Sequence, residues 1–225
     1  MIRKVGLVLL VLGGLVLSWA GVTLVWGDPL TSLYTRYEQH ELAERLTSID
    51  GVWHTRGLAP TSSSDDRAPA AILLRRRAVA FEQTVVDGQP IGRIEIPRIG
   101  LSMVVVEGVS TSDLEKGPGD YGVASGRSTQ LPGAGGVVAI AGHRTTFLHP
   151  FLRIDELRAG DRIALRMPYG TFRYTVYAHA VVASDDWSIL RPARFEKLVL
   201  TACHPRFSAT HRWVVFARLT ASSPG

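Results

Sequence analysis

The chain begins with a run of apolar residues that contains no charged side chain. The run covers residues 5–26 and follows Arg3 and Lys4. A helix of this length, at about 1.5 Å per residue, crosses the ~30 Å hydrocarbon core of a bilayer. The basic residues before it predict a single-pass membrane protein with a cytoplasmic N-terminus and an extracellular remainder. A cleaved signal peptide is the alternative, with Ser18-Trp19-Ala20 as its small-x-small site.

Residues 28–50 carry apolar side chains at roughly helical spacing, with Arg and Glu between them. This pattern predicts an amphipathic helix, for which a stalk is a simpler interpretation than docking on the bilayer or on the rest of the chain. Residues 59–70, APTSSSDDRAPA, have the composition of a linker. We therefore expect a cytoplasmic stub and anchor at residues 1–27, a stalk helix and linker at residues 28–87, and a catalytic domain at residues 88–225.

The pattern changes near Gly88 to short apolar runs separated by Gly and Pro. These runs cover residues 91–99, 103–109, 136–141, 162–167, 172–182, 195–202 and 213–219. Helix-like patterns recur only near residues 112–116, 150–157 and 187–190. At least seven short strands with so little helix predict a mainly β domain, namely a closed or nearly closed β-barrel.

Composition and charge exclude several classes of protein. The 225 residues are 46% hydrophobic, so the chain can form a core. The net charge of +5 is spread along the chain rather than gathered in a basic stripe, so we predict no nucleic-acid partner. The sequence has no phosphate-binding loop, no dinucleotide-binding fingerprint and no zinc-type Cys/His spacing, so we predict no cofactor.

Cys203 is the only cysteine, and therefore the chain can form no intramolecular disulfide. It ends an apolar run, and Pro205 follows two positions later. A buried, inert thiol is the simplest interpretation of such a residue. Outside the cell, however, an exposed thiol is open to oxidation, so its presence there favours a functional role.

Two further residues fit the chemistry of a nucleophilic thiol. His143 follows the apolar run at residues 136–141, where a strand end would present it, and an imidazole can supply the thiolate and later a proton. Arg212 opens the run after the cysteine loop, and a hairpin would bring it beside Cys203 to stabilise an oxyanion. Arg206 is nearer in sequence, whereas Arg218 should lie about 20 Å along the strand from Arg212.

These residues resemble those of the sortases, the membrane-anchored cysteine transpeptidases of Gram-positive bacteria. The matching stretches are AGHRTT at residues 141–146, LTACHP at residues 200–205, and Arg212 at the start of the last strand. Residues 114–121 and 150–163 are also similar, so the resemblance covers nearly all of residues 88–219. The combination of GHRTT with CHP looks most like the class E sortases of high-GC actinobacteria.

The resemblance implies an eight-stranded sortase-type barrel in which Cys203 is the nucleophile, His143 the acid–base partner and Arg212 the stabiliser of substrate and oxyanion. It also implies cleavage of a C-terminal sorting signal between Thr and Gly. The signal would be LAxTG in class E, where other classes prefer LPxTG. A thioacyl enzyme would then pass the surface protein to an amine of the peptidoglycan precursor or of a pilin lysine.

The chain departs from the family pattern in two places. Ala202 stands where the family has a Thr before the cysteine, so we expect activity to persist with an altered rate or specificity. The acidic calcium-binding cluster of some class A members has no obvious counterpart, so we predict no metal.

Three alternatives to a sortase remain. An L,D-transpeptidase would carry an SHGC-like box with its His some twenty residues upstream, whereas His143 lies 60 residues before Cys203. A papain-like hydrolase would place Cys before His. A catalytically silent, membrane-tethered binding module is the third alternative, and Ala202 is the only feature that favours it.

Overall fold

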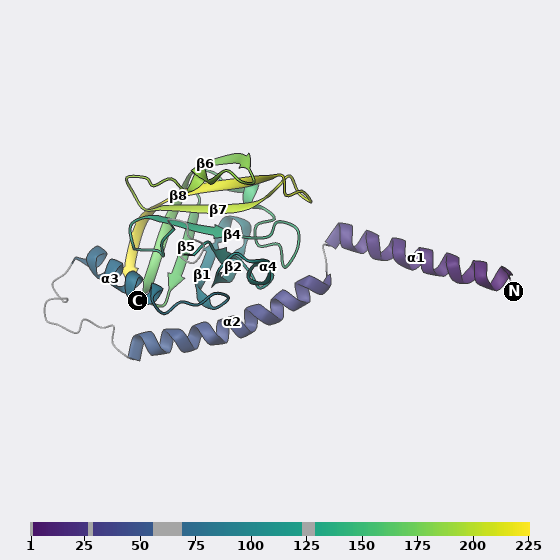
Figure 1. Cartoon of the computed structure of the whole chain (residues 1–225), viewed down its shortest axis with the longest axis horizontal. Coiled ribbons are helices and arrows are strands. Elements are labelled where there is room, and N and C mark those ends of the chain that lie inside the picture. Colours follow the sequence, from purple (N-terminus) through teal and green to yellow (C-terminus); the bar gives the residue numbers. More distant parts are fainter. Residues whose placement is uncertain (1, 27–28, 56–68, 123–128) are drawn as a thin grey trace.

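A computed structural model of the chain describes residues 2–26, 29–55, 69–122 and 129–225. Its strands are β1 (Pro90–Ile96), β2 (Leu101–Glu107), β3 (Gly119–Asp120), β4 (Val137–Ala141), β5 (Arg162–Met167), β6 (Gly170–Ala183), β7 (Lys197–His204) and β8 (His211–Pro224). Within the described residues these eight strands close into a barrel in the order β1-β2-β3-β4-β7-β8-β6-β5 (Figure 1). The predicted β-barrel is therefore confirmed.

Short helical segments connect the strands. They are η1 (Pro97–Ile99), α4 (Thr111–Leu114), η3 (Ile154–Glu156) and η4 (Trp187–Leu190). The last three lie in the stretches where the sequence predicts helix-like structure. Ser110 caps α4 in a capping box with Asp113, which explains why a helix of this length forms there.

All five residues of strand β4 are buried, because both of its faces are covered. Val138 and Ile140 belong to the main core inside the barrel. Val137 and Ala139 belong to a second apolar cluster on the outside, which also contains Leu190 of η4. An almost continuous apolar run is what burial on two sides requires.

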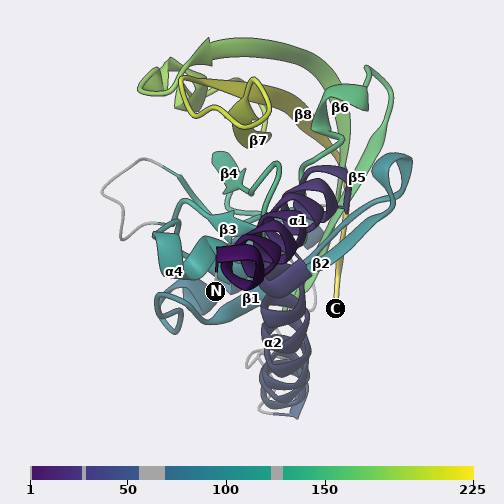
Figure 2. The same ribbon diagram turned by 90° about the vertical axis from the view of Figure 1, so that its right-hand side faces the viewer.

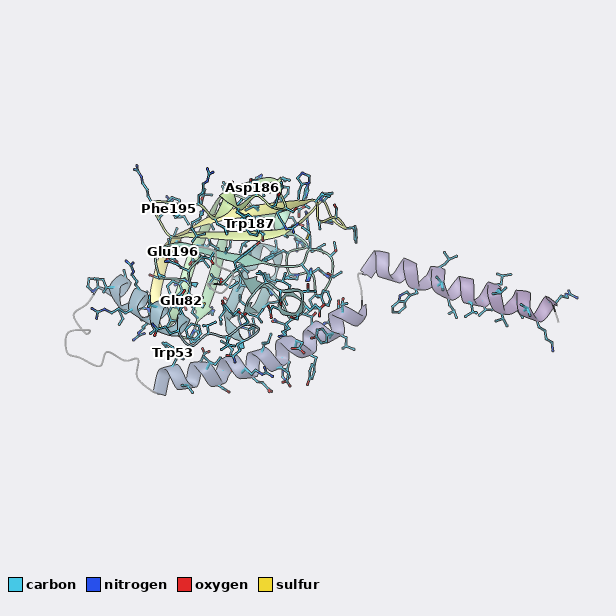
Figure 3. The ribbon with its side chains drawn as sticks, in the orientation of Figure 1. Trp53, Glu82, Asp186, Trp187, Phe195 and Glu196 are labelled. Carbon is cyan, nitrogen blue, oxygen red and sulfur yellow. The ribbon has the colours of Figure 1, made fainter. Side chains whose placement is uncertain are left out.

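The connection into β4 is fixed by a buried carboxylate at the start of β7, that of Glu196 (labelled in Figure 3). It accepts hydrogen bonds from the backbone N–H of Gly133 (3.0 Å) and Gly135 (2.9 Å) and from the hydroxyl of Tyr174 (2.6 Å). Charge-assisted bonds of this kind hold the turn before β4 against the start of β7. Glu196 directly precedes Lys197, which pairs with Val137 at the start of the β4–β7 register.

Helix α2 (Pro29–Thr55) lies along the outside of the barrel, below β1 and β2 in Figures 1 and 2. Leu42 and Leu46 of this helix pack on Val104 and Val106 of β2. The segment is helical as predicted, but it is docked on the barrel and does not stand clear of it as a stalk would. Helical spacing alone does not reveal which surface the apolar stripe covers.

Helix α3 (Ala70–Glu82) also contributes to the barrel core, through Leu74, Ala78 and Phe81. The ring of Trp53, labelled near the end of α2 in Figure 3, meets the ring of Phe81 edge-on at 5.1 Å between centroids. The folded unit therefore includes both helices as well as the strands. Most of the predicted linker at residues 59–70 lies outside the described residues.

The N-terminal apolar run forms α1 (Ile2–Trp26), which extends away from the barrel in Figure 1. Side chains of α1 are described at residues 3–19 and 21. In the part of the chain that the structure describes, no helix is both long and apolar enough to span a membrane. The single-pass anchor expected at residues 5–26 stays a prediction.

Candidate active site

Cys203 and Arg212 lie side by side on neighbouring strands. The antiparallel pairing of β7 with β8 places Cys203 directly opposite Arg212. Cys203 is a free, partly exposed cysteine close to the end of β7. The hairpin expected from the sequence therefore brings the guanidinium-bearing residue to the thiol, as predicted.

His143 reaches the same place from the other side of β7. Strands β4 and β7 are parallel, with Ala141 paired to Thr201, and the N–H of Gly142 donates to the carbonyl of Thr201 (3.1 Å). His143 follows two residues after Ala141, and Cys203 follows two residues after Thr201, so both lie just past the last pair of this register. The three residues singled out in the sequence thus come from the adjacent strand ends of β4, β7 and β8.

The chain turns sharply after His143, around the side chain of Phe151. The N–H of Phe151 donates to the carbonyl of His143 (3.1 Å). A Cβ at position 142 would lie 2.6 Å from the Phe151 ring, so only Gly142 leaves room for this packing. The glycine before the histidine therefore sets the direction in which His143 leaves β4.

The imidazole of His143 is partly buried and packs against the ring of Phe147, with 5.0 Å between centroids. Burial lowers its pKa from the ordinary value, because desolvation disfavours the charged ring, and the nearby carboxylate of Glu115 opposes this effect. The ring is therefore mainly neutral at pH 7, which is the form that can accept a proton from a thiol.

The guanidinium of Arg212 is anchored on its own loop. Its Nη1 donates to the carbonyls of Ala209 (2.9 Å) and His211 (3.0 Å). An arginine has several further N–H donors, which a substrate oxygen can engage. Arg206, the nearer arginine in sequence, instead faces η3, where its Nη2 lies 3.4 Å from the Leu152 carbonyl oxygen and 3.8 Å from an oxygen of Asp155.

Sequence reasoning missed a buried arginine at this site. The side chain of Arg144 is only 3% exposed and forms an ion pair with Asp155 (2.6 Å). It also contacts the Cys203 carbonyl and the His204 ring. Arg144 was visible in the motif at residues 141–146, but its burial was not, because its partners come from η3 and β7.

Side chains that could bind a metal ion do not cluster in the described part of the chain. Among the described residues, no group of three His, Cys, Asp or Glu side chains is arranged to hold a metal ion. The absence of a metal and of a cofactor stays a prediction from the sequence.

The comparison with known proteins decides the family. The model of the sortase domain matches residues 94–220, which is more than half of the chain. This chain belongs to the sortase family. Sortases are cysteine transpeptidases, so the prediction of an enzyme is confirmed. The matched residues include His143, Cys203 and Arg212.

Curated relatives come from more than one sortase group. The chain is 36% identical to sortase D of Bacillus subtilis over 136 residues, which cover 58% of this chain and 64% of that protein. It is 28% identical to sortase SrtE1 of Streptomyces coelicolor over 148 residues, which cover 61% of this chain and 42% of that protein. The sortase described here therefore spans less than two thirds of either relative.

Solved structures of sortases share the barrel. Sortase E1 from Streptomyces coelicolor, determined with a tripeptide in its active site, superposes with a TM-score of 0.57 and 27% identity, covering 62% of this chain and 93% of that one. Sortase E from Streptomyces avermitilis has a TM-score of 0.55 and 31% identity over the same shares. These class E structures agree with the similarity noted in the sequence.

Proposed function

We propose that this sortase cleaves a C-terminal sorting signal between Thr and Gly and transfers the protein to an amine. Cys203 is the nucleophile, His143 the acid–base partner and Arg212 the oxyanion and substrate stabiliser. The observation that supports the proposal most is the pairing of Cys203 with Arg212 across β7 and β8, next to a β4–β7 register that ends two residues before His143 and Cys203. Family membership supports the reaction type.

In the first half-reaction, the Cys203 thiol transfers its proton to the neutral His143 ring, and Sγ attacks the Thr carbonyl carbon. The carbonyl electron pair moves to oxygen, and the Arg212 guanidinium stabilises the resulting oxyanion. The Thr–Gly C–N bond then breaks as His143 returns its proton to the leaving Gly amine. A thioester between Thr and Cys203 remains.

In the second half-reaction, an incoming amine attacks the thioester carbonyl. His143 accepts the proton that the amine loses, and the C–S bond breaks to release Cys203, which recovers its proton. The products are an amide between the surface protein and the acceptor, and free enzyme. The acceptor is an amine of the peptidoglycan precursor or of a pilin lysine, as the family resemblance implies.

The Ala202 departure does not argue strongly for a silent binding module. Successive side chains of a strand point to opposite faces. Ala202 is 3% exposed and belongs to the core inside the barrel, whereas Thr201 hydrogen-bonds Tyr121 of the outer cluster. Cys203 therefore shares a face with Thr201, and the missing hydroxyl at position 202 belongs to the opposite face.

The full chain, purified in detergent, should be incubated with LAxTG and LPxTG peptides, with and without an amine acceptor. The complete chain is used because α2 and α3 pack on the barrel. Mass spectrometry should find cleavage after Thr and an acyl adduct on Cys203, and we expect LAxTG to be preferred. Cys203→Ala is the control and should abolish both. Intact peptide and unmodified thiol in the wild type would favour the binding module.

We propose in addition that residues 5–26 attach the enzyme to the cell membrane, with the catalytic domain on the extracellular side. The run is uncharged, and α1 exposes many large apolar side chains, such as Leu10 and Leu17, both 75% exposed. Membranes washed with carbonate should retain the full chain and release a chain that lacks residues 1–26. Release of both chains would refute the attachment.

A further inference from the structure

Arg144 is a buried cation beside the proposed catalytic pair. A buried guanidinium is unfavourable unless ion pairing and hydrogen bonds replace its lost hydration. Its side chain is 3% exposed, although the residues on either side of it, His143 and residues 145–149, are partly exposed. The contacts that make this burial tolerable therefore indicate what the side chain does.

One terminal nitrogen of the Arg144 guanidinium contacts the end of β7. Nη1 donates to Nδ1 of His204 (2.9 Å) and lies 3.4 Å from the backbone carbonyl oxygen of Cys203. Because a guanidinium can only donate, Nδ1 of His204 is the acceptor, and the proton of the neutral ring is on Nε2. Arg144 thus fixes both the backbone that carries the thiol and the tautomer of the next side chain.

The other terminal nitrogen of the guanidinium is bound by Asp155. Nη2 donates to Oδ2 of Asp155 at 2.6 Å. The guanidinium carbon also lies 5.9 Å from the centre of the ring of Trp213, which is the residue after Arg212. The side chain therefore joins the His143 loop, η3 and the facing ends of β7 and β8.

Unpaired polar atoms gather at the same place. Among the described residues, five buried side-chain atoms have no hydrogen-bond partner. Four of them are Nε2 of His143, Nε of Arg144, Oδ1 of Asp155 and Nε1 of Trp213. Buried groups that lack a partner are rare and tend to occur at functional sites, where polar groups are held for a purpose other than stability.

We propose that Arg144 is a positioning residue, which sets the Cys203 backbone relative to His143. This inference rests on the proposed transpeptidase function. Arg144 is covalently next to the acid–base partner and hydrogen-bonded to the residue that bears the nucleophile. We therefore expect a substitution that breaks these contacts to alter the relative position of the two reacting groups. A misplacement of about 1 Å at reacting groups can lower a rate by about 10²-fold.

The test compares Arg144→Lys with the wild-type full chain. Lysine keeps the charge that pairs with Asp155. It lacks the planar guanidinium, whose two terminal nitrogens bond Asp155 and His204 at the same time. At a temperature at which both proteins are folded, we expect kcat to fall about 10²-fold while KM changes little. Arg206→Gln is the matched control, because Arg206 also approaches Asp155 (3.8 Å) but is 48% exposed. It should retain wild-type kcat.

A second measurement does not depend on turnover. Iodoacetamide reacts with Cys203 alone, since it is the only cysteine. The ratio of the alkylation rates at pH 7 and pH 9.5 cancels changes in access to the thiol. We expect Arg144→Lys to lower this ratio about fivefold, because a displaced His143 no longer accepts the thiol proton as Sγ attacks the reagent at pH 7. Arg206→Gln should leave the ratio unchanged.

The outcomes separate the two proposals. A wild type that cleaves no peptide would overturn the proposed function, while the alkylation ratio would still test the role of Arg144. A folded Arg144→Lys enzyme with unchanged kcat and an unchanged ratio would overturn the positioning role. If Arg144→Lys does not fold, Asp155→Asn, which leaves Arg144 in place but removes its anchor, should lower kcat and the ratio in the same direction. Unchanged values would contradict the inference.

Discussion

Arg212 and Arg218 lie on the same strand, but only Arg212 is opposite Cys203, since Arg218 is paired with Lys197. We predict that Arg212→Ala lowers kcat/KM by about 10²–10³-fold, the range for loss of one oxyanion donor. Steady-state kinetics with a sorting-signal peptide measures this. Arg218→Ala is the matched control and should remain near wild-type activity. Equal losses in the two variants would point to overall charge rather than to position.

The pKa of His143 predicts the acidic limb of the pH–rate profile. Burial lowers this pKa from its ordinary value of 6.5, although Glu115 opposes the shift. We therefore expect kcat/KM to decrease as the pH is lowered, with a midpoint below pH 6.5. Because the folded state binds the His143 proton more weakly than the unfolded state does, the neutral ring's contribution to stability is complete above pH 6.5. That contribution is lost as the pH falls through the folded pKa.

Phe147 provides the variant for this prediction, because its ring covers that of His143. Phe147→Ala should expose the imidazole and move the acidic limb up toward pH 6.5. Phe207→Ala is the control, since Phe207 is 80% exposed on the cysteine loop and shares a positive φ with Phe147. A limb that does not move in Phe147→Ala would show that the ring does not set the pKa.

At the scale of elements, one side-chain amide adds hydrogen bonds to the apolar docking of α2 on β2. The Gln39 carboxamide accepts from the N–H of Val104 (2.7 Å) and donates to the carbonyls of Val104 (3.0 Å) and Lys116 (2.9 Å). The helix therefore continues the hydrogen bonding of β2 on the side that faces away from β1. The nearby hydroxyl of Thr35 adds a bond to the Glu115 carbonyl (2.8 Å).

We predict that Gln39→Ala lowers the free energy of unfolding by about 1–3 kcal/mol, because backbone groups of β2 would lose their partners. Urea unfolding of the full chain in detergent measures this change. Thr47→Ala on the same helix is the control, since Thr47 only donates to the carbonyl of Ala43 at an exposed position. A Gln39→Ala protein as stable as Thr47→Ala would mean that α2 is held by its apolar contacts alone.

At the scale of the whole molecule, two buried carboxylates link stability to pH. Burial raises the pKa of Asp120, and the neighbouring Glu107 raises it further. Burial also raises the pKa of Glu107 to about 7, with contributions from Asp87, Glu82 and Asp113. Because the folded state binds the Glu107 proton more tightly than the unfolded state does, stability decreases as the pH rises from about 4.5 to 7.

Glu107→Gln removes the charge but keeps the shape of the side chain. We predict that it raises Tm by about 3 °C or more at pH 8, where Glu107 is ionised, and has little effect at pH 4, where the carboxyl is protonated. Differential scanning calorimetry at the two pH values measures this. Glu44→Gln, at an exposed position of α2, should change Tm at neither pH. A Glu107→Gln protein without a gain at pH 8 would contradict the raised pKa.

The parts that could be predicted from the sequence are those with a local or periodic signal. Strand runs and turns indicated the barrel, because alternation of apolar side chains reports directly on a surface with one buried face. The motifs around His143 and Cys203 indicated the site, and the hairpin placed Arg212, because pairing across one short loop is determined by chain direction. These inferences need no knowledge of distant segments.

Other features were decided only by the tertiary structure, because they depend on contacts between segments far apart in the chain. The apolar stripe of α2 specifies a helix but not its partner, and β2 is that partner. Arg144 and Glu107 resemble exposed charged residues in the sequence, yet both are buried. Burial and ion pairing are properties of the assembled molecule, so the sequence by itself determined the barrel and the Cys–His–Arg set, and the tertiary structure determined what surrounds and holds them.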